Sequence, residues 1–126
     1  MRSLCSLCVC VLAGSVLLAG CDEEEEGPSV GELTRASDSL CEKYGECDAT
    51  YDVANCRSAG QTEADRLAGL TGDDCQGYVD RLAEYNDCLA SQTCDALEND
   101  PDVCAAESMA VATFAAEDGF DCPGAI

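Results

Sequence analysis

The amino-acid sequence predicts a small all-α domain, rich in disulfides, that comprises two tandem helical-hairpin repeats. Apolar side chains recur every three or four residues in four stretches, which is the spacing of one helix face. No stretch shows the sustained apolar–polar alternation of a half-buried strand. Eight cysteines fall into two sets of four with nearly the same spacing, which indicates an internal repeat. We therefore expect about four short helices, over residues 30–45, 52–69, 74–91 and 101–117.

Each expected helix carries one apolar stripe. The stripe positions, helix by helix, are Val30, Leu33, Ser37, Leu40 and Tyr44; Val53, Cys56, Gly60, Ala64, Leu67 and Leu70; Tyr78, Leu82, Tyr85 and Leu89; and Val103, Ala106, Ala110 and Phe114. Because a single stripe must be covered by a neighbour, the helices are expected to pair as two hairpins.

Turn and cap residues mark the expected helix ends. Gly45 and Gly72 lie where the first and second helices should stop, and Asp73 or Asp74 can cap the third. Gly60 and Gly69 in the second helix each cost about 1 kcal/mol relative to Ala, so that helix should be the least stable.

The fourth helix has its own start and stop signals. Asp100 is the expected N-cap and Pro101 the first helical residue. The negative charge of Asp102 would stabilise the positive N-terminal end of the helix. Gly119 is the expected stop.

The spacing of the cysteines indicates a duplicated chain. The two sets are Cys41, Cys47, Cys56 and Cys75, then Cys88, Cys94, Cys104 and Cys122. The tripeptide Cys47-Asp48-Ala49 recurs as Cys94-Asp95-Ala96, so we place the repeat units at about 30–75 and 76–122.

An even number of cysteines in a small exported domain predicts four disulfides. If both units form the same bridges, symmetry favours pairing within each unit. The expected pairs are then Cys47 with Cys56, Cys94 with Cys104, Cys41 with Cys75, and Cys88 with Cys122. The alternative is a crossed arrangement in which Cys56 or Cys104 bonds to the other repeat.

The first 20 residues have the features of an export signal. Arg2 precedes an uncharged apolar run, Leu4–Leu18, and the small residues Ala19 and Gly20 stand directly before Cys21. The run is too short for the roughly 20 residues of a membrane span. The segment resembles the lipobox of bacterial lipoproteins, and this resemblance implies that residues 1–20 are removed and that Cys21 carries a lipid.

Composition restricts the partners of the remaining chain. After loss of Arg2 it would retain 26 acidic and five basic side chains, a formal charge of −21, which makes nucleic acid a poor partner. Five of the acids form the run Asp22–Glu26, so residues 21–29 are expected to be an acidic tether and residues 30–126 the cysteine-rich helical domain.

The sequence offers little for catalysis, and we expect a protein that is not an enzyme and has no cofactor. It contains no His, so Ser-His-Asp and Cys-His sets and His-containing metal sites are excluded. The acidic residues around Asp73-Asp74 and 99–102 suggest a calcium-binding module as an alternative function, although helix capping and solubility explain them more simply. A small cell-envelope hydrolase or redox protein is a second alternative, motivated only by the abundance of carboxylates and cysteines.

Tyrosines are the only large amphipathic side chains. Tyr44, Tyr78 and Tyr85 lie on the stripes and are expected in the core, whereas Tyr51 lies in a turn and is the candidate partner contact. Tandem cysteine-rich helical units behind a lipobox resemble the small cysteine-rich lipoproteins of myxobacteria. The resemblance implies a membrane-anchored, exported protein of the cell envelope, and we expect it to act as a structural or protein-interaction module with an unknown protein partner.

The processing site gives a direct prediction. Mass spectrometry of the membrane fraction should find a mature chain that begins at an acylated Cys21, because the resemblance to a lipobox implies both lipidation and cleavage. Substitution Cys21→Ser should abolish both, and a Cys21→Ser chain still cleaved after Gly20 would contradict the assignment.

Overall fold

The structure is a computed structural model that describes residues 27–126, and these residues form five helices and no strand. The helices are α1 (Gly31–Cys47), α2 (Val53–Ala68), α3 (Cys75–Ala90), α4 (Cys94–Asn99) and α5 (Ala105–Ala115). The prediction of an all-α domain is confirmed. The expected number of helices was one too small, because the short helix α4 was missed.

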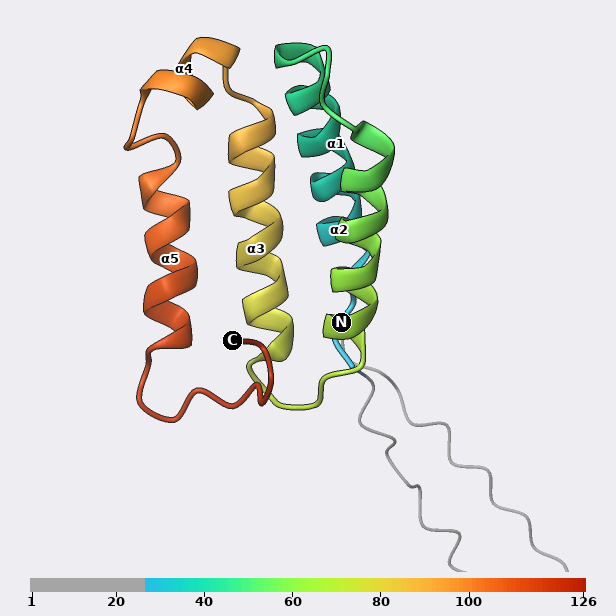
Figure 1. Ribbon diagram of the computed structural model, residues 1–126. Helices are drawn as coiled ribbons and strands as arrows, with labels where there is room; N and C mark the ends of the chain where they lie inside the picture. The colour runs from blue at the N-terminus through green and yellow to red at the C-terminus, as the bar shows by residue number, and fades with distance from the viewer. Residues whose placement is uncertain (1–26) are drawn as a thin grey trace, which may run out of the picture.

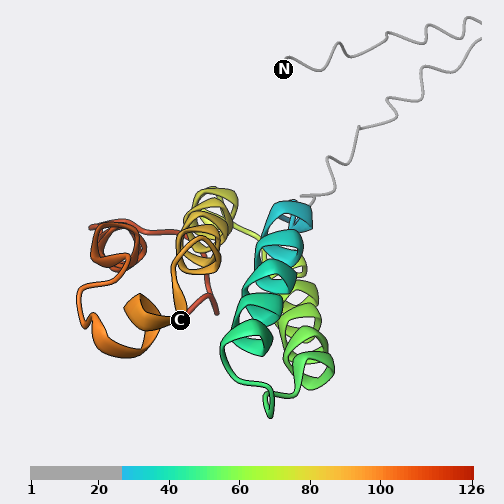
Figure 2. The ribbon, with the colours of Figure 1, turned by 90° about the horizontal axis from the view of Figure 1, so that it is seen from above.

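The four longer helices lie side by side in the order α2, α1, α3, α5 (Figures 1 and 2). Helices α1 and α3 run in one direction and α2 and α5 in the other, while α4 lies across one end (Figure 1). Helix α1 packs against both α2 and α3, and α3 packs against α5. The central pair is therefore α1 and α3, and the edge helices are α2 and α5.

The core is small and contains few large side chains. Its buried members are Leu33, Ala36, Leu67, Cys75, Tyr78, Val79, Ala83, Cys122 and Ala125. The predicted stripes contain three of them, Leu33, Leu67 and Tyr78, whereas Ala36, Val79 and Ala83 were not assigned to a stripe. The alanines at the contacts among α1, α2 and α3 let these helices approach closely.

Helix α1 continues through Gly45 to Cys47, so the stop expected at Gly45 was wrong. A Cβ atom at Gly45 would collide with the side chain of Val53, the first residue of α2. The glycine therefore makes room for the chain to fold back after α1, rather than ending the helix.

The segment after α3 differs most from the expectation. Asp100 does not cap a helix that begins at Pro101; its Oδ1 accepts a hydrogen bond from the Asp102 amide at 2.9 Å, which forms a turn instead. Helix α5 begins only at Ala105, after Cys104, which has a left-handed backbone with φ 54°. Helix α4 uses the preceding Thr93 as its cap, which accepts from the Ala96 amide.

Gly72 is required by the contact between the α2–α3 loop and the C-terminal tail. Its φ is +154°, and a Cβ atom there would collide with the carbonyl of Asp121. Asp74 stands at the N-cap position of α3, as one of the two expected candidates, but its carboxylate accepts from the Asp121 amide at 2.8 Å. The Asp74 amide also donates to the Asp121 carbonyl at 3.2 Å, so a side chain and the backbone together join the loop to the tail.

All four predicted cysteine pairs were wrong. The disulfides join Cys41 with Cys56, Cys47 with Cys94, Cys75 with Cys122, and Cys88 with Cys104. Two of them connect cysteines from different sets, so the hairpins are not bridged separately. The crossed alternative also named the wrong cysteines, because Cys56 and Cys104 both pair within their own sets.

The geometry of the α1–α2 hairpin explains the first difference. Cys47 is the last residue of α1, whereas Cys56 lies in the first turn of α2, so Cys56 faces a position further back along α1. That position is Cys41, with a Cα–Cα distance of 5.8 Å. The end of α1 instead lies near the start of α4, where Cys47 bonds to Cys94.

The signal segment, Cys21 and the acidic run Asp22–Glu26 lie outside the described residues. The last three residues assigned to the tether pack on the domain: Pro28 is buried, and the Ser29 amide donates to Gln76 Oε1 at 2.6 Å. Among the helices of residues 27–126, none has the length and apolar character needed to cross a bilayer.

Two bridges of equal loop length allow the contribution of burial to be measured. Cys47–Cys94 and Cys75–Cys122 each span 47 residues, so loss of either costs about 4 kcal/mol in the chain-entropy model. Only the second is buried, with Cys75 1% and Cys122 3% exposed. We expect Cys75→Ala/Cys122→Ala to lower the free energy of unfolding more than Cys47→Ala/Cys94→Ala, because it also leaves a cavity in the core.

Urea denaturation of the two double variants checks this expectation. A domain already unfolded without Cys75–Cys122 but folded without Cys47–Cys94 would agree with it. Equal losses, or a larger loss for Cys47–Cys94, would contradict it.

Candidate functional site

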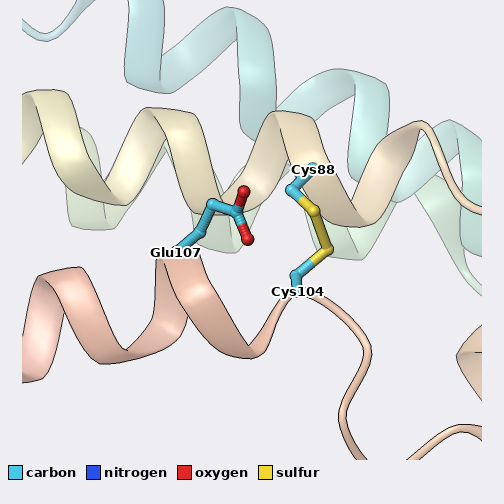
Figure 3. A group of neighbouring side chains, drawn as sticks. All are labelled: Cys88, Cys104 and Glu107. Carbon is cyan, nitrogen blue, oxygen red and sulfur yellow. A yellow bond between two sulfur atoms is a disulfide. The ribbon is translucent and has the colours of Figure 1, made fainter.

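Within residues 27–126, one group of side chains has the composition and spacing of a metal site. Ligand atoms of Cys88, Cys104 and Glu107 lie within 4.8 Å of one another. Figure 3 shows that Cys88 comes from α3, and that Cys104 and Glu107 come from the start of α5. The two cysteines form a disulfide, so neither offers the thiolate that zinc requires. Glu107 is the only ligand left, and one carboxylate is not a metal centre.

The position of Glu107 in this group bears on how readily a thiol can reduce the disulfide. Thiol–disulfide exchange begins when a thiolate attacks a sulfur atom, and the Glu107 carboxylate places a negative charge beside both sulfurs. Cys88 is the more exposed of the two, and its sulfur accepts a weak hydrogen bond from Gln92 Nε2 at 3.7 Å. Glu107 is therefore positioned to repel an incoming thiolate.

Two of the four carboxylates that suggested calcium binding, those of Asp74 and Asp100, have structural partners. Asp74 accepts from the Asp121 amide, and Asp100 accepts from the Asp102 amide. In the described part of the chain, no three carboxylates converge on one point. Asp74 thus serves a loop contact and Asp100 a turn, and carboxylates alone form no preformed cation site within residues 27–126.

A pocket of about 210 Å³ lies among α1, α2 and α3. It is lined by Leu33, Ser37, Gly60, Glu63, Tyr78, Leu82 and Asn86. Three of its polar side chains already have partners: Asn86 donates to the Ser37 hydroxyl at 3.0 Å, and Glu63 pairs with Arg66 at 2.6 Å. Leu33, Leu82 and Tyr78 thus give the pocket a largely apolar lining, and its one carboxylate, that of Glu63, is paired with a cation.

Tyr51 lies in the turn that joins α1 to α2, and 38% of it is exposed. Its ring packs on Tyr44 with the centroids 5.4 Å apart and the planes at 46°. Asp48 and Asp52, on either side of Tyr51 in the turn, are exposed. We call Tyr44, Asp48, Tyr51 and Asp52 the tip surface.

Hydrogen bonds fix the shape of this turn. Asp48 Oδ1 accepts from the Thr50 hydroxyl at 2.7 Å and from the Thr50 amide at 2.8 Å, and these bonds hold the pKa of the Asp48 carboxyl below its usual value. Asp52 caps α2 by accepting from the Asn55 amide at 2.9 Å. Tyr51 is therefore presented on a built turn rather than on a loose loop.

The other tyrosines are less accessible. Tyr78 is buried in the core, and Tyr44 and Tyr85 are half-buried. Burial, together with the neighbouring Tyr51 and Tyr85, raises the pKa of Tyr44. Tyr51, the residue selected from the sequence, is thus the most exposed of the four.

Sequence reasoning assigned no partners to the basic side chains. Arg35 of α1 donates to both carboxylate oxygens of Asp87 in α3, at 2.6 and 3.2 Å. Arg81 instead lies over the Phe114 ring, 3.8 Å from its centroid, and links α3 to α5. Neither contact could be inferred from periodicity, because the partners are 52 and 33 residues apart in sequence.

Neither protein-family profiles, nor curated proteins, nor solved structures match this chain.

The position of Glu107 gives a kinetic prediction. Glu107→Gln should speed the reduction of Cys88–Cys104 by dithiothreitol about fivefold, because removing a charge some 5 Å away in a water-like medium is worth roughly 1 kcal/mol. Glu117→Gln, which removes an exposed charge beyond the other end of α5, is the matched control and should leave the rate unchanged.

Alkylation of the quenched reaction followed by peptide mass spectrometry measures this one bridge. High salt should reduce the difference between Glu107→Gln and the unsubstituted chain. Equal rates for the two at low salt would show that Glu107 does not protect the disulfide.

Proposed function

We propose that this chain is an exported lipoprotein, anchored in the cell envelope by a lipid on Cys21, and that its helical domain is a non-enzymatic protein-interaction module. The lipobox supports the anchor. Four disulfides suggest a domain that folds outside the cytoplasm, where thiols are oxidised.

One geometric observation carries the proposal: the N-terminal segment that begins at Gly27 enters the domain at the end opposite the α1–α2 turn, which carries the tip surface (Figure 1). Gly27 lies against the carbonyl of Ala68 at the end of α2, whereas Tyr51 directly precedes α2. The 16 residues of α2 separate the two by about 24 Å. A lipid on Cys21, joined to Gly27 by five acidic residues, would keep one end near the bilayer and direct the tip surface away from it.

The chemistry of the described residues favours binding over catalysis. Cys88 and Cys104 are oxidised to a disulfide, and the one carboxylate of the pocket is paired with Arg66. Asp74 and Asp100 serve a loop contact and a turn. No observation on residues 27–126 favours the calcium-binding or hydrolase alternatives.

We also propose that the domain arose by duplication, with α1 equivalent to α3 and α2 equivalent to α5. The two bridges within sets span 15 and 16 residues, and the two between sets both span 47. In each set the first cysteine bonds to the third, while second bonds to second and fourth to fourth. Equivalent positions of two copies meet only near the axis that relates them, so this pattern supports an approximate twofold axis between α1 and α3.

Photo-crosslinking in the native cells tests the interaction module. A crosslinking amino acid at Ala49, next to the tip surface, should give an adduct of discrete mass. The matched control is the exposed Ala59 on α2, which should give none.

Loss of the adduct on Cys21→Ser would tie the interaction to the anchored form. No adduct from position 49, or equal adducts from positions 49 and 59, would contradict an interaction module that acts through this end.

A further inference from the structure

The tip surface combines two aromatic rings with two carboxylates and has no cation of its own. The basic side chains nearest in sequence already have partners: Lys43 pairs with Glu46 at 2.6 Å, and Arg57 pairs with Glu42. The carboxylates of Asp48 and Asp52 each use one oxygen, Oδ1, within the turn. Each therefore keeps Oδ2 for another donor.

The chain shows elsewhere how one of its aromatic rings is covered by a cation. The guanidinium of Arg81 lies 3.8 Å from the centre of the Phe114 ring and also donates to the Gly77 carbonyl at 2.9 Å. Gly77 makes room for this arrangement, because a Cβ atom there would lie 2.9 Å from Phe114. The rings of Tyr44 and Tyr51 have no such partner within residues 27–126.

The turn that carries the tip surface is braced on both sides. Cys47 precedes it and bonds to Cys94, and Cys56 follows it and bonds to Cys41. Val53 fills the space left by Gly45. A site held in one shape loses little conformational entropy on binding, so modest contacts suffice for measurable affinity.

We propose that the tip surface binds an arginine side chain of a partner protein, with the guanidinium on the face of Tyr51 and hydrogen-bonded to Asp48 and Asp52. This inference rests on the proposed interaction module and names the chemistry of its partner. A guanidinium stacks on aromatic faces and presents a planar set of donors to carboxylates, so it fits both halves of the surface. The formal charge of −20 draws a basic segment toward the protein before contact.

The test uses the full mature lipoprotein in detergent micelles, at 0.15 M salt. The probe is N-acetylarginine amide, titrated while backbone amide shifts are recorded by NMR. N-acetylcitrulline amide is the matched neutral probe, because it has the same shape without the charge. With the arginine probe, the chemical-shift changes should concentrate in residues 44–53. The citrulline probe should bind with an affinity at least fivefold lower.

Conservative variants separate charge from structure. Asp48→Asn and Asp52→Asn keep an oxygen at Oδ1 for the turn and the cap but remove the charge, and each should weaken binding severalfold. Tyr51→Ala should weaken it about tenfold, whereas Tyr51→Phe should bind as the unsubstituted chain does. Asp118→Asn, an exposed carboxylate in the loop after α5, should have no effect.

Two results would overturn the proposal. One is a set of shifts spread evenly over the carboxylates of the whole domain, which indicates unspecific attraction only. The other is equal affinity for the two probes, or equal affinity of Tyr51→Ala and the unsubstituted chain for the arginine probe. If position 49 crosslinks to a protein but the arginine probe does not bind, the proposed interaction module is supported and the proposed arginine partner is contradicted. If the probe binds but position 49 gives no crosslink, the interaction module is contradicted.

Discussion

The Cys75–Cys122 disulfide lies inside the apolar core, and the packing of the rest of the domain depends on it. Its sulfur atoms share the core with Leu33, Leu67 and Tyr78, in a chain that contains no Trp and only two Phe. A core this thin gains little from burial alone. The bridge supplies apolar contact in the folded state and also restricts the unfolded chain.

The same bridge holds the C-terminal tail, which has no secondary structure of its own. Around it, Gly72 and Asp74 contact Asp121, and Arg66 donates to the Gly124 carbonyl. The tail therefore covers the end of the helices at which Gly27 joins the domain. At the other end, Cys47–Cys94 ties α1 to α4 and braces the turn of the tip surface. The two ends of the domain thus differ in role: the end covered by the tail closes the core, and the end braced by Cys47–Cys94 presents Tyr51.

Helix periodicity was visible in the sequence because it depends on neighbouring residues. The ranges expected for the first three helices agree with α1, α2 and α3 to within about two residues at each end. The predicted start of the fourth helix was wrong because local signals competed. Asp100 and Pro101 are typical of a helix start, but the Asp100 carboxylate accepts a hydrogen bond from the Asp102 amide and forms a turn. The left-handed Cys104 then sets the true start, and its bond to Cys88 is a tertiary constraint without a local signal.

The disulfide pairing could not be predicted for a related reason. Spacing alone favoured local pairs, since it says nothing about which helices become neighbours. In the folded domain, Cys47 at the end of α1 meets Cys94 at the start of α4, and Cys75 at the start of α3 meets Cys122 in the C-terminal tail. For the candidate site, the exposure of Tyr51 followed from its place in a turn. The carboxylate of Glu107 beside a disulfide did not, because it depends on how α5 lies against α3.

Partial reduction followed by peptide mapping of the purified native domain tests the central claim most directly, because the four bridges determine both the closed core and the braced tip. The structure requires peptides that join Cys41 to Cys56, Cys47 to Cys94, Cys75 to Cys122, and Cys88 to Cys104. A peptide that joins Cys47 to Cys56 or Cys41 to Cys75 would contradict this account, because each hairpin would then be bridged separately.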